Sequence, residues 1–333
     1  MHIHVIDGFA DFSAIRENWE AVYEADPEAQ FFLSWQWLYD WLQVHQTPWL
    51  VLAAQHAKDD REYVAFLSLR MGAAFDKSRG FFNVLLFGGT GFSDYAGILV
   101  RPEHAAEALP ALAEYVTREL HWARFTMHNL TMSDERRQLF LGGFDRIRFA
   151  HRPLEQINPG ETTDHAICLS VDLPPSWEDY LESLSANNRQ KIRRLLRKVD
   201  AAQTCRITLS GSEDYDRNLA TMLEFWRIKW APSKGEASAG ELAELNRAML
   251  ERCARSGTLL LPVFWHGDRP VAALAILIDW CKQSLLFFIT GRDESYREMP
   301  AGYLLHAYSI RHAIAHGFAT YDFLKGDDRY KLL

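Results

Sequence analysis

The sequence lacks a segment that could cross a membrane. Its longest apolar run, residues 271–278, stops at Asp279 and is far shorter than the roughly 20 residues that a membrane helix needs. The first twelve residues contain two aspartates and neither lysine nor arginine, so the basic region of a secretory signal is also missing. We therefore expect a cytoplasmic protein without a membrane span.

Paired cysteines and an excess of positive charge are lacking as well. The four cysteines, at positions 168, 205, 253 and 281, form no C-x-x-C pair, which predicts buried reduced thiols rather than disulfides or a thiolate zinc site. Lys and Arg total 36 against 44 Asp and Glu, a net charge of -8, which argues against a protein that coats DNA through charge alone. No H-E-x-x-H arrangement is present, and we expect no metal.

One order of elements occurs twice along the 333 residues, about 200 residues apart. Each half contains a helical stretch rich in Trp, a β-hairpin, a third strand, an amphipathic helix and a short strand. In the first half these are residues 32–42, 49–55 with 62–71, 82–87, 105–120 and 123–128. In the second half they are residues 219–230, 258–265 with 270–279, 284–290, 301–316 and 319–324.

The repetition predicts an α+β protein of two similar domains, each a mixed, mostly antiparallel sheet flanked by helices. Pro and Gly mark irregular chain at residues 154–163, which places the domains at 1–158 and 159–333. The competing interpretation is that helices and hairpins alternate by chance. A second stretch of small and polar residues, 231–240, is expected to be a mobile loop.

A basic helical segment has no counterpart in the first half. Apolar residues follow helical spacing from Trp177 to Val199, with a break expected near Asn187 and Asn188. The second part, residues 187–199, surrounds a narrow apolar stripe with six cations. These are Arg189, Lys191, Arg193, Arg194, Arg197 and Lys198. They predict a surface that attracts phosphate or carboxylate, or, as the alternative, a solvated face with acidic partners such as Asp200.

The segment FFITGRDESYREMPAG, residues 287–302, predicts an anion site. A strand ends in it and a helix begins, with Pro300 suited to the first helical turn. The free amides of Ala301, Gly302 and Tyr303 then carry the positive end of the helix dipole. Gly302 leaves the backbone accessible to a diphosphate, and Arg297 adds a formal charge at the rim.

The pattern R-x-x-P-x-G from Arg297 to Gly302 resembles the R/Q-x-x-G-x-G/A pyrophosphate loop of the GNAT acyltransferases, with Pro300 in place of the first glycine. Together with the basic segment and the run from Tyr321 to Gly326, it resembles the tandem-domain GNAT branch. That branch includes the CelD-like acetyltransferases of polysaccharide synthesis and the FemABX peptidyltransferases. Residues 91–95, Gly-Phe-Ser-Asp-Tyr, are similar to a Gly-x-x-Asp-Tyr element of the CelD-like group.

The resemblance implies an N-acyltransferase that uses acetyl-CoA or another acyl-CoA, without a metal or a covalent enzyme intermediate. The pantetheine arm is expected between the strands that contain residues 285–290 and 319–324, next to Ile289 and Thr290. The first half lacks the loop, so the second half is expected to bind the donor and the first to shape a cleft for the acceptor. That acceptor is an amine of a small molecule, a sugar or a peptide.

The resemblance also suggests roles for single residues. Asp322 is the candidate base, Lys325 stabilises the oxyanion or an acceptor carboxylate, and Tyr330 donates a proton to the thiolate. Asp94 and Tyr95 are candidates for acceptor binding, as are Arg189 and Arg193, which alternatively hold a CoA phosphate. Several of these residues also have a structural interpretation. In it, Asp322 bonds to nearby loop amides, Tyr330 is a packing anchor near the chain end, and Asp94 caps a turn.

Two other functions use the same features. FemABX-like transfer of an aminoacyl group from tRNA is favoured by the basic segment. A non-catalytic, GNAT-derived binding protein is favoured by Pro300 in place of a motif glycine. Acceptor identity, acyl chain length and oligomeric state are not set by the sequence.

Overall fold

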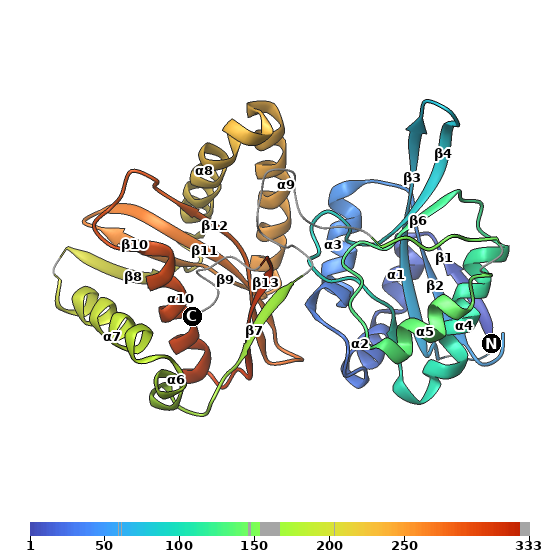
Figure 1. The fold of residues 1–333 in the computed structure, drawn as a ribbon, viewed down its shortest axis with the longest axis horizontal. Helices are drawn as coiled ribbons and strands as arrows, with labels where there is room; N and C mark the ends of the chain where they lie inside the picture. Colours follow the sequence, from blue (N-terminus) through green and yellow to red (C-terminus); the bar gives the residue numbers. More distant parts are fainter. Residues whose placement is uncertain (59, 61, 146–147, 154–166, 203, 327–333) are drawn as a thin grey trace. The chain divides into compact units, whose positions relative to one another are not determined.

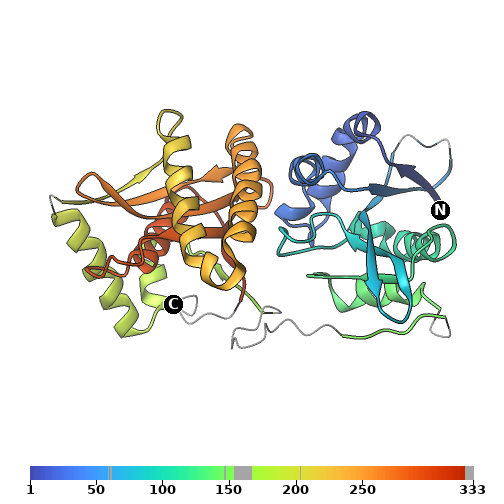
Figure 2. The ribbon, with the colours of Figure 1, turned by 90° about the horizontal axis from the view of Figure 1, so that it is seen from above.

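The computed structural model describes residues 1–333 except 59, 61, 146–147, 154–166, 203 and 327–333 (Figure 1). The chain divides into two compact units, Met1–Glu155 and Gln156–Leu333. The irregular chain expected at residues 154–163 lies outside the described residues. Each unit is built on one mixed sheet with helices packed against it (Figure 2).

The sheet of the first unit has the strand order β1-β2-β3-β4-β6, with β5 beside β3. All neighbours are antiparallel except β4 and β6, which are parallel. The strands are β1 His2–Ile6, β2 Trp49–Gln55, β3 Ala65–Asp76, β4 Gly80–Phe87, β5 Leu99–Val100 and β6 Arg124–Thr126. The helices are α1 Phe9–Ala14, α2 Arg16–Ala25, α3 Trp35–His45, α4 Ala105–Arg118 and α5 Asp134–Gly142, with short 3-10 turns η1 Phe31–Leu33 and η2 Pro102–His104.

The sheet of the second unit has the order β7-β13-β12-β11-β10-β8, with β9 beside β11. Only β12 and β13 are parallel. The strands are β7 Cys168–Asp172, β8 Cys205–Leu209, β9 Leu259–Leu260, β10 Pro262–His266, β11 Arg269–Asp279, β12 Ser284–Arg292 and β13 Thr320–Lys325. The helices are α6 Trp177–Ser183, α7 Ala186–Ala201, α8 Tyr215–Lys234, α9 Glu236–Arg255 and α10 Ala301–Ala315.

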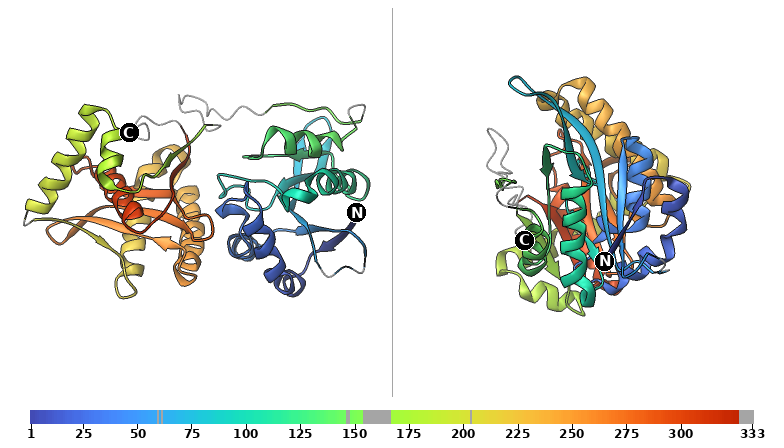
Figure 3. Two further views of the ribbon diagram at one scale, coloured as in Figure 1. Left: turned by 90° about the horizontal axis from the view of Figure 1, so that it is seen from below. Right: turned by 90° about the vertical axis from the view of Figure 1, so that its right-hand side faces the viewer.

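Two helical layers cover the second sheet. Helices α6, α7 and α10 share one hydrophobic core with the strands, in which α10 packs on β10 to β13. Helix α8 packs on β11 and β12, and α9 packs on α8, on the opposite face (Figures 1 and 3). The central strands β11 and β12 are therefore buried on both sides, which explains the continuous apolar run of residues 271–278.

The predicted repetition is confirmed. In each unit an antiparallel hairpin, β2–β3 or β10–β11, is followed by a third strand, a helix and a strand parallel to the third. The fold class, two mixed sheets flanked by helices, is thus as expected. Strands β1, β7 and β8 were not expected. β7 and β8 are short edge strands whose residues are mostly exposed or half-buried, so they show no apolar signal.

The loop predicted at residues 231–240 is wrong. Helix α8 continues to Lys234 and α9 begins at Glu236, so one residue, Gly235, separates two long helices. Gly235 has a φ of 84°, which glycine adopts without strain. Small and polar residues indicated a loop, but alanine and glutamate favour helix once Gly235 has turned the chain.

The break in the basic helix is also displaced. It lies at Leu184 and Ser185 rather than at the two asparagines, because the Ser185 hydroxyl accepts a hydrogen bond from the Asn188 amide and caps α7. The asparagines form the first turn. The prediction of buried thiols is correct for Cys253, whereas Cys205 is half-buried and Cys168 and Cys281 are exposed.

One glycine fixes how closely α8 approaches the sheet. A Cβ atom added to Gly291 of β12 would lie 1.9 Å from the carbonyl oxygen of Met222, which is backbone and cannot move aside. Gly291 therefore allows the direct helix-to-strand contact. The contact fixes the end of β12, from which the predicted anion loop leaves the sheet.

Gly291→Ala is expected to lower the free energy of unfolding by about 1–3 kcal/mol, because α8 must shift to accept the methyl group. Gly302→Ala in α10 is the matched control, since an added Cβ there meets nothing within 4 Å. Urea unfolding followed by circular dichroism measures both. Equal stability of the two variants would contradict the packing described for Gly291.

Candidate functional site

Strands β12 and β13 separate within the sheet. They pair at three positions, ending with Leu286 opposite Asp322, although β12 continues to Arg292 while paired with β11 on its other side. A bulge accompanies the separation, because Ala275 and Ile276 of β11 face Ile289 and Phe287, which leaves Phe288 as an extra residue. Past Leu286, no described strand pairs with the edge of β12 that faces β13, and we call the space between the two diverging strands the wedge.

The wedge begins where the sequence predicted the pantetheine arm. Ile289 and Thr290 lie on β12 past the last pair with β13, and both are half-buried. The Thr290 hydroxyl donates a hydrogen bond of 3.0 Å to the Ala273 carbonyl, so it holds β11 to β12. The wedge therefore combines backbone hydrogen-bonding groups with partly exposed apolar side chains, which suits an extended amide-containing chain.

Asp322 lies at the point where the strands part. Two residues of β13, Phe323 and Leu324, occupy the space of one in the register against β7, so β13 also has a bulge. Leu324 has a φ of 56°, a left-handed conformation that is unfavourable for leucine. The Asp322 carboxylate accepts a hydrogen bond of 2.7 Å from the Leu324 amide and stabilises this turn. Asp322 thus has a structural role, whatever its part in catalysis.

The helix α10 starts with free amides. Pro300 is its N-cap, one position before the predicted first turn, and offers no side-chain acceptor. The first amide with an acceptor is that of Leu304, which donates to the Pro300 carbonyl at 3.0 Å. Among the described residues, nothing accepts from the amides of Ala301, Gly302 and Tyr303. Since an added Cβ at Gly302 would meet open space, the helix end can receive an anion.

The loop before α10 is held by its own hydrogen bonds. Asp293 accepts bonds from the amide and hydroxyl of Ser295 and pairs with Arg269, and these contacts lower the pKa of its carboxyl group. Arg292 pairs with Glu294. Arg297 is exposed and forms no ion pair within the described part of the chain, so its guanidinium is available to a ligand.

The structure brings the basic helix α7 to the start of α10. The Lys191 ammonium lies 3.9 Å from the ring centroid of Tyr303, which belongs to the first turn of α10. Burial raises the pKa of Tyr303, whose hydroxyl has no partner among the described residues, so the ring stays neutral under the cation. The sequence analysis includes Lys191 among the six cations of this segment, but it selects Arg189 and Arg193 as the ligand-binding candidates.

The cations of α7 divide into two flanks. A helix turns by 100° per residue, so Lys191, Arg194 and Lys198 lie on one flank of α7. This flank faces α10, because its Lys191 contacts Tyr303. The opposite flank carries Arg189, Arg193 and Arg197. None of these six side chains forms an ion pair with a described residue, including Asp200. The acidic partners of the alternative interpretation are therefore missing.

A buried histidine of α10 contacts both strands that border the wedge. His306 of α10 is 2% exposed, and its Nδ1 atom is 2.9 Å from the Tyr321 hydroxyl. Its ring also packs on Phe287 of β12 and Phe323 of β13, the strands that part here. His306 therefore ties α10 to both sides of the wedge. Its only signal in the sequence is a single His in an otherwise apolar stretch of helix.

In the first unit, the segments that follow β4 and β6 pair with each other, whereas β12 and β13 of the second unit separate. After β4, Ala96 bridges to Leu130, and it exchanges backbone hydrogen bonds with Asn129 and Thr131 beyond β6. Tyr95 is 7% exposed and packs against Phe32, so it is part of the core. The described residues of the first unit thus provide no counterpart of the wedge beside β12.

The positions of the remaining predicted site residues add little to the description of the site. Asp94 is half-buried, and Lys325 is half-buried at the end of β13, opposite Cys168. Tyr330 lies outside the described residues.

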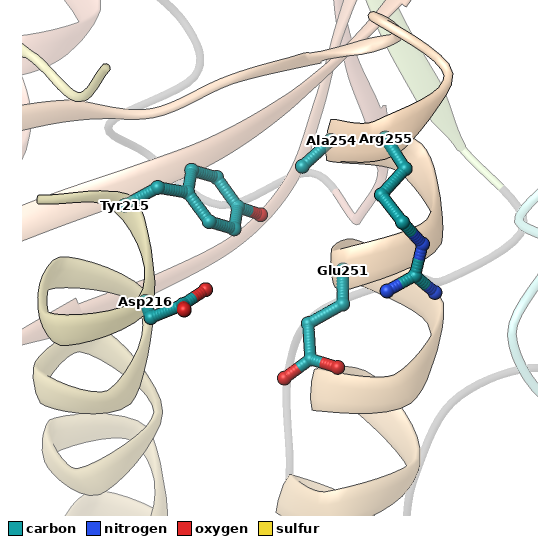
Figure 4. Close-up of a pocket in the computed structure, with 5 residues that line it drawn as sticks. All are labelled: Tyr215, Asp216, Glu251, Ala254 and Arg255. Atoms are coloured by element: carbon teal, nitrogen blue, oxygen red, sulfur yellow. The ribbon is translucent and has the colours of Figure 1, made fainter. Parts of the chain in front are cut away.

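A separate shallow pocket lies between the start of α8 and the end of α9 (Figure 4). It is lined by Tyr215, Asp216, Glu251, Ala254 and Arg255. The Tyr215 hydroxyl donates to the Leu250 carbonyl at 3.1 Å, and burial raises the pKa of this tyrosine. With two carboxylates at its wall, this pocket is a poor diphosphate site and contains no predicted site residue.

Comparisons with known proteins identify the fold. Residues 186–332 match the profile of the family described as "Acetyltransferase (GNAT) domain". No curated protein sequence is significantly similar to the chain.

Solved structures resemble both units. FemX aligns over 99% of this chain and 90% of its own, with a TM-score of 0.65 at 11% identity. A conserved protein of unknown function from Bacteroides thetaiotaomicron aligns over 97% of this chain and 90% of its own (TM-score 0.55, 13% identity). The C-terminal domain of a putative lysylphosphatidylglycerol synthetase from Agrobacterium fabrum aligns over 94% of this chain and 78% of its own (TM-score 0.50, 9% identity).

The two units therefore have a tandem GNAT fold like that of FemX. The match of residues 186–332 to the acetyltransferase family supports an acyltransferase type of function for the second unit. The CelD-like branch stays a prediction. Among the described residues, no three His, Cys, Asp or Glu side chains gather as metal ligands. No described helix is both long and apolar enough to span a membrane.

Asp322→Ala is expected to lower the free energy of unfolding by about 1–3 kcal/mol, because the Leu324 amide loses its acceptor in a strained turn. Asp322→Asn is the matched control, since its amide oxygen still accepts that bond. Denaturant unfolding of the two variants measures the difference. If alanine is tolerated as well as asparagine, the structural role of Asp322 is refuted.

Proposed function

We propose that the chain is an N-acyltransferase that takes an acyl group from an acyl-CoA, acetyl-CoA before others, and transfers it to an amine. One observation carries the proposal. The amides of residues 301–303 have no acceptor among the described residues, and an added Cβ at Gly302 would meet nothing within 4 Å. They belong to the helix that follows the strand bordering the wedge. In CoA the diphosphate is joined to pantetheine, so a helix N-terminus that binds the diphosphate must lie next to the site that binds the pantetheine arm.

The residues present fit an acyl-CoA. The amides of Ala301, Gly302 and Tyr303 would hold the diphosphate, and Arg297 and Lys191 would add positive charge beside it. The unpaired edge of β12 would bind the amide groups of pantetheine as a strand binds a neighbour. The cofactor supplies an acyl thioester, which an amine attacks without help from a metal.

Asp322 is the candidate for removing the amine proton. It lies at the narrow end of the wedge, on the side of the sheet away from Tyr321 and Phe323, whose rings contact α10 through His306. Its carboxylate is held by the Leu324 amide and is thus fixed in position. Lys325, one residue beyond the bulge, is the candidate for stabilising developing negative charge.

We assign donor binding to the second unit alone. In the first unit, Ala96 pairs with the chain that follows β6, so we propose that this unit contributes to acceptor selection. The acceptor is an amine of a small molecule, a sugar or a peptide. The likeness to CelD-like enzymes implies polysaccharide or envelope synthesis as its setting.

Gly302→Glu is expected to weaken acetyl-CoA binding at least tenfold, an order-of-magnitude estimate, because a carboxylate would enter the open space before the free amides. Gly240→Glu on α9 is the matched control, since this helical glycine also faces open space. Isothermal titration calorimetry with acetyl-CoA measures all three proteins. A wild-type protein that does not bind, or a Gly302→Glu variant that binds equally well, refutes the proposal.

A second candidate function is transfer of an aminoacyl group from tRNA, as in the FemABX group. The observation that favours it is the set of six cations on α7 without ion pairs among the described residues, in a chain of net charge -8. A structural relation to FemX agrees with it at the level of the fold. The two candidates differ in the donor that the cations of α7 bind, which is an acyl-CoA in the first and an aminoacyl-tRNA in the second.

Replacing Lys191, Arg194 and Lys198 by alanine is expected to weaken acetyl-CoA binding by about fivefold for each lost phosphate contact of about 1 kcal/mol, and so by about 100-fold if all three contact a phosphate. Replacing Arg189, Arg193 and Arg197, on the other flank, removes the same charge and is expected to have little effect. Calorimetry with acetyl-CoA and gel shifts with tRNA separate the donors. Salt-sensitive tRNA binding without affinity for CoA would favour the second candidate.

A further inference from the structure

The hairpin of β3 and β4 extends beyond the rest of its sheet. β2 pairs with β3 only as far as Arg70, and β6 pairs with β4 only from Val84 to Leu86. Residues 73–76 and 80–82 therefore have no strand partner among the described residues outside the hairpin, and this part is a two-stranded ribbon. The ribbon projects from the body of the first unit (Figure 1; right-hand view in Figure 3).

Two exposed aromatic rings lie at the end of this ribbon. Phe75 and Phe81 are paired across the strands, and their ring centroids are 5.0 Å apart. They are 62% and 81% exposed, more than any other large apolar side chain among the described residues. Ala73 and Asn83, the next pair on this face, are exposed too, so no described residue of the unit covers the rings.

The turn between the strands carries exposed cations. Lys77 and Arg79 are exposed and form no ion pair with a described residue. Asp76, the acidic residue of the turn, accepts hydrogen bonds from Ser78 and the Arg79 amide, and these bonds lower the pKa of its carboxyl group. The tip thus has a net positive charge in a chain of net charge -8.

We propose that this tip, residues 75–81, is a docking point for an anionic lipid surface. Aromatic rings at the end of a narrow projection can enter the interface between headgroups and acyl chains, while cations beside them bind lipid phosphates. The charge pattern argues against a second copy of this chain as the occupant, because two such tips would repel each other. The surface is independent of the donor site of the second unit.

Vesicle flotation tests the proposal with phosphatidylcholine vesicles that contain phosphatidylglycerol and with vesicles of phosphatidylcholine alone. The full chain is expected to bind the anionic vesicles and to dissociate at high salt. Phe75→Ser with Phe81→Ser is expected to weaken binding at least tenfold, as an order of magnitude. Lys77→Ser with Arg79→Ser is expected to weaken it by about fivefold for each cation.

Ile228→Ser is the matched control, because Ile228 is 54% exposed on α8 of the other unit. It is expected to leave vesicle binding unchanged. Thermal unfolding verifies that the tip variants fold, which is expected since the rings lie outside the core. The proposal is overturned if the wild type does not bind anionic vesicles, if it binds neutral ones equally, or if the Phe variants bind as well. A dimer in sedimentation equilibrium that the Phe variants abolish also overturns it, in favour of a second copy.

Discussion

The candidate site depends on the separation of two parallel strands. β12 and β13 share only three paired positions, and a bulge in each strand accompanies their divergence. Because an unpaired strand edge in a protein interior must find hydrogen-bond partners, such an edge is retained where a ligand can supply them. Asp322 at the Leu324 turn and His306 beneath the strands both stabilise this arrangement. In the first unit the segments that follow the equivalent strands pair with each other, which distinguishes two otherwise similar folds.

Positive charge also distinguishes the start of α10 from the rest of the chain. The chain carries a net charge of -8, yet the start of α10 combines Lys191 with three amides and with Arg297, for which the described residues provide no hydrogen-bond acceptor or ion-pair partner. A helix dipole is effective only within its first turn, so the cations of α7 matter because Lys191 lies against that turn. The proposed anion site is therefore built from two segments that are about 110 residues apart in the sequence.

The sequence predicted those parts of the fold that depend on local signals. The hairpins, the amphipathic helices and the repetition follow from apolar periodicity and turn residues, and the start of α10 follows from Pro300. Contacts between distant segments gave no such signal. The bulge at Phe288, the contact of Lys191 with Tyr303 and the role of Gly291 against Met222 depend on strand register and helix approach. The segment at 231–240 was misassigned because alanine, serine and glycine occur in both loops and helix ends.

The central claim is that the free amides at the start of α10 bind the diphosphate of CoA. Nuclear magnetic resonance of protein labelled selectively at glycine, titrated with CoA, tests it most directly. The account predicts a large shift of the Gly302 amide signal, while that of Gly240 on α9 does not move. A Gly302 signal that stays in place when CoA is in excess would contradict the account.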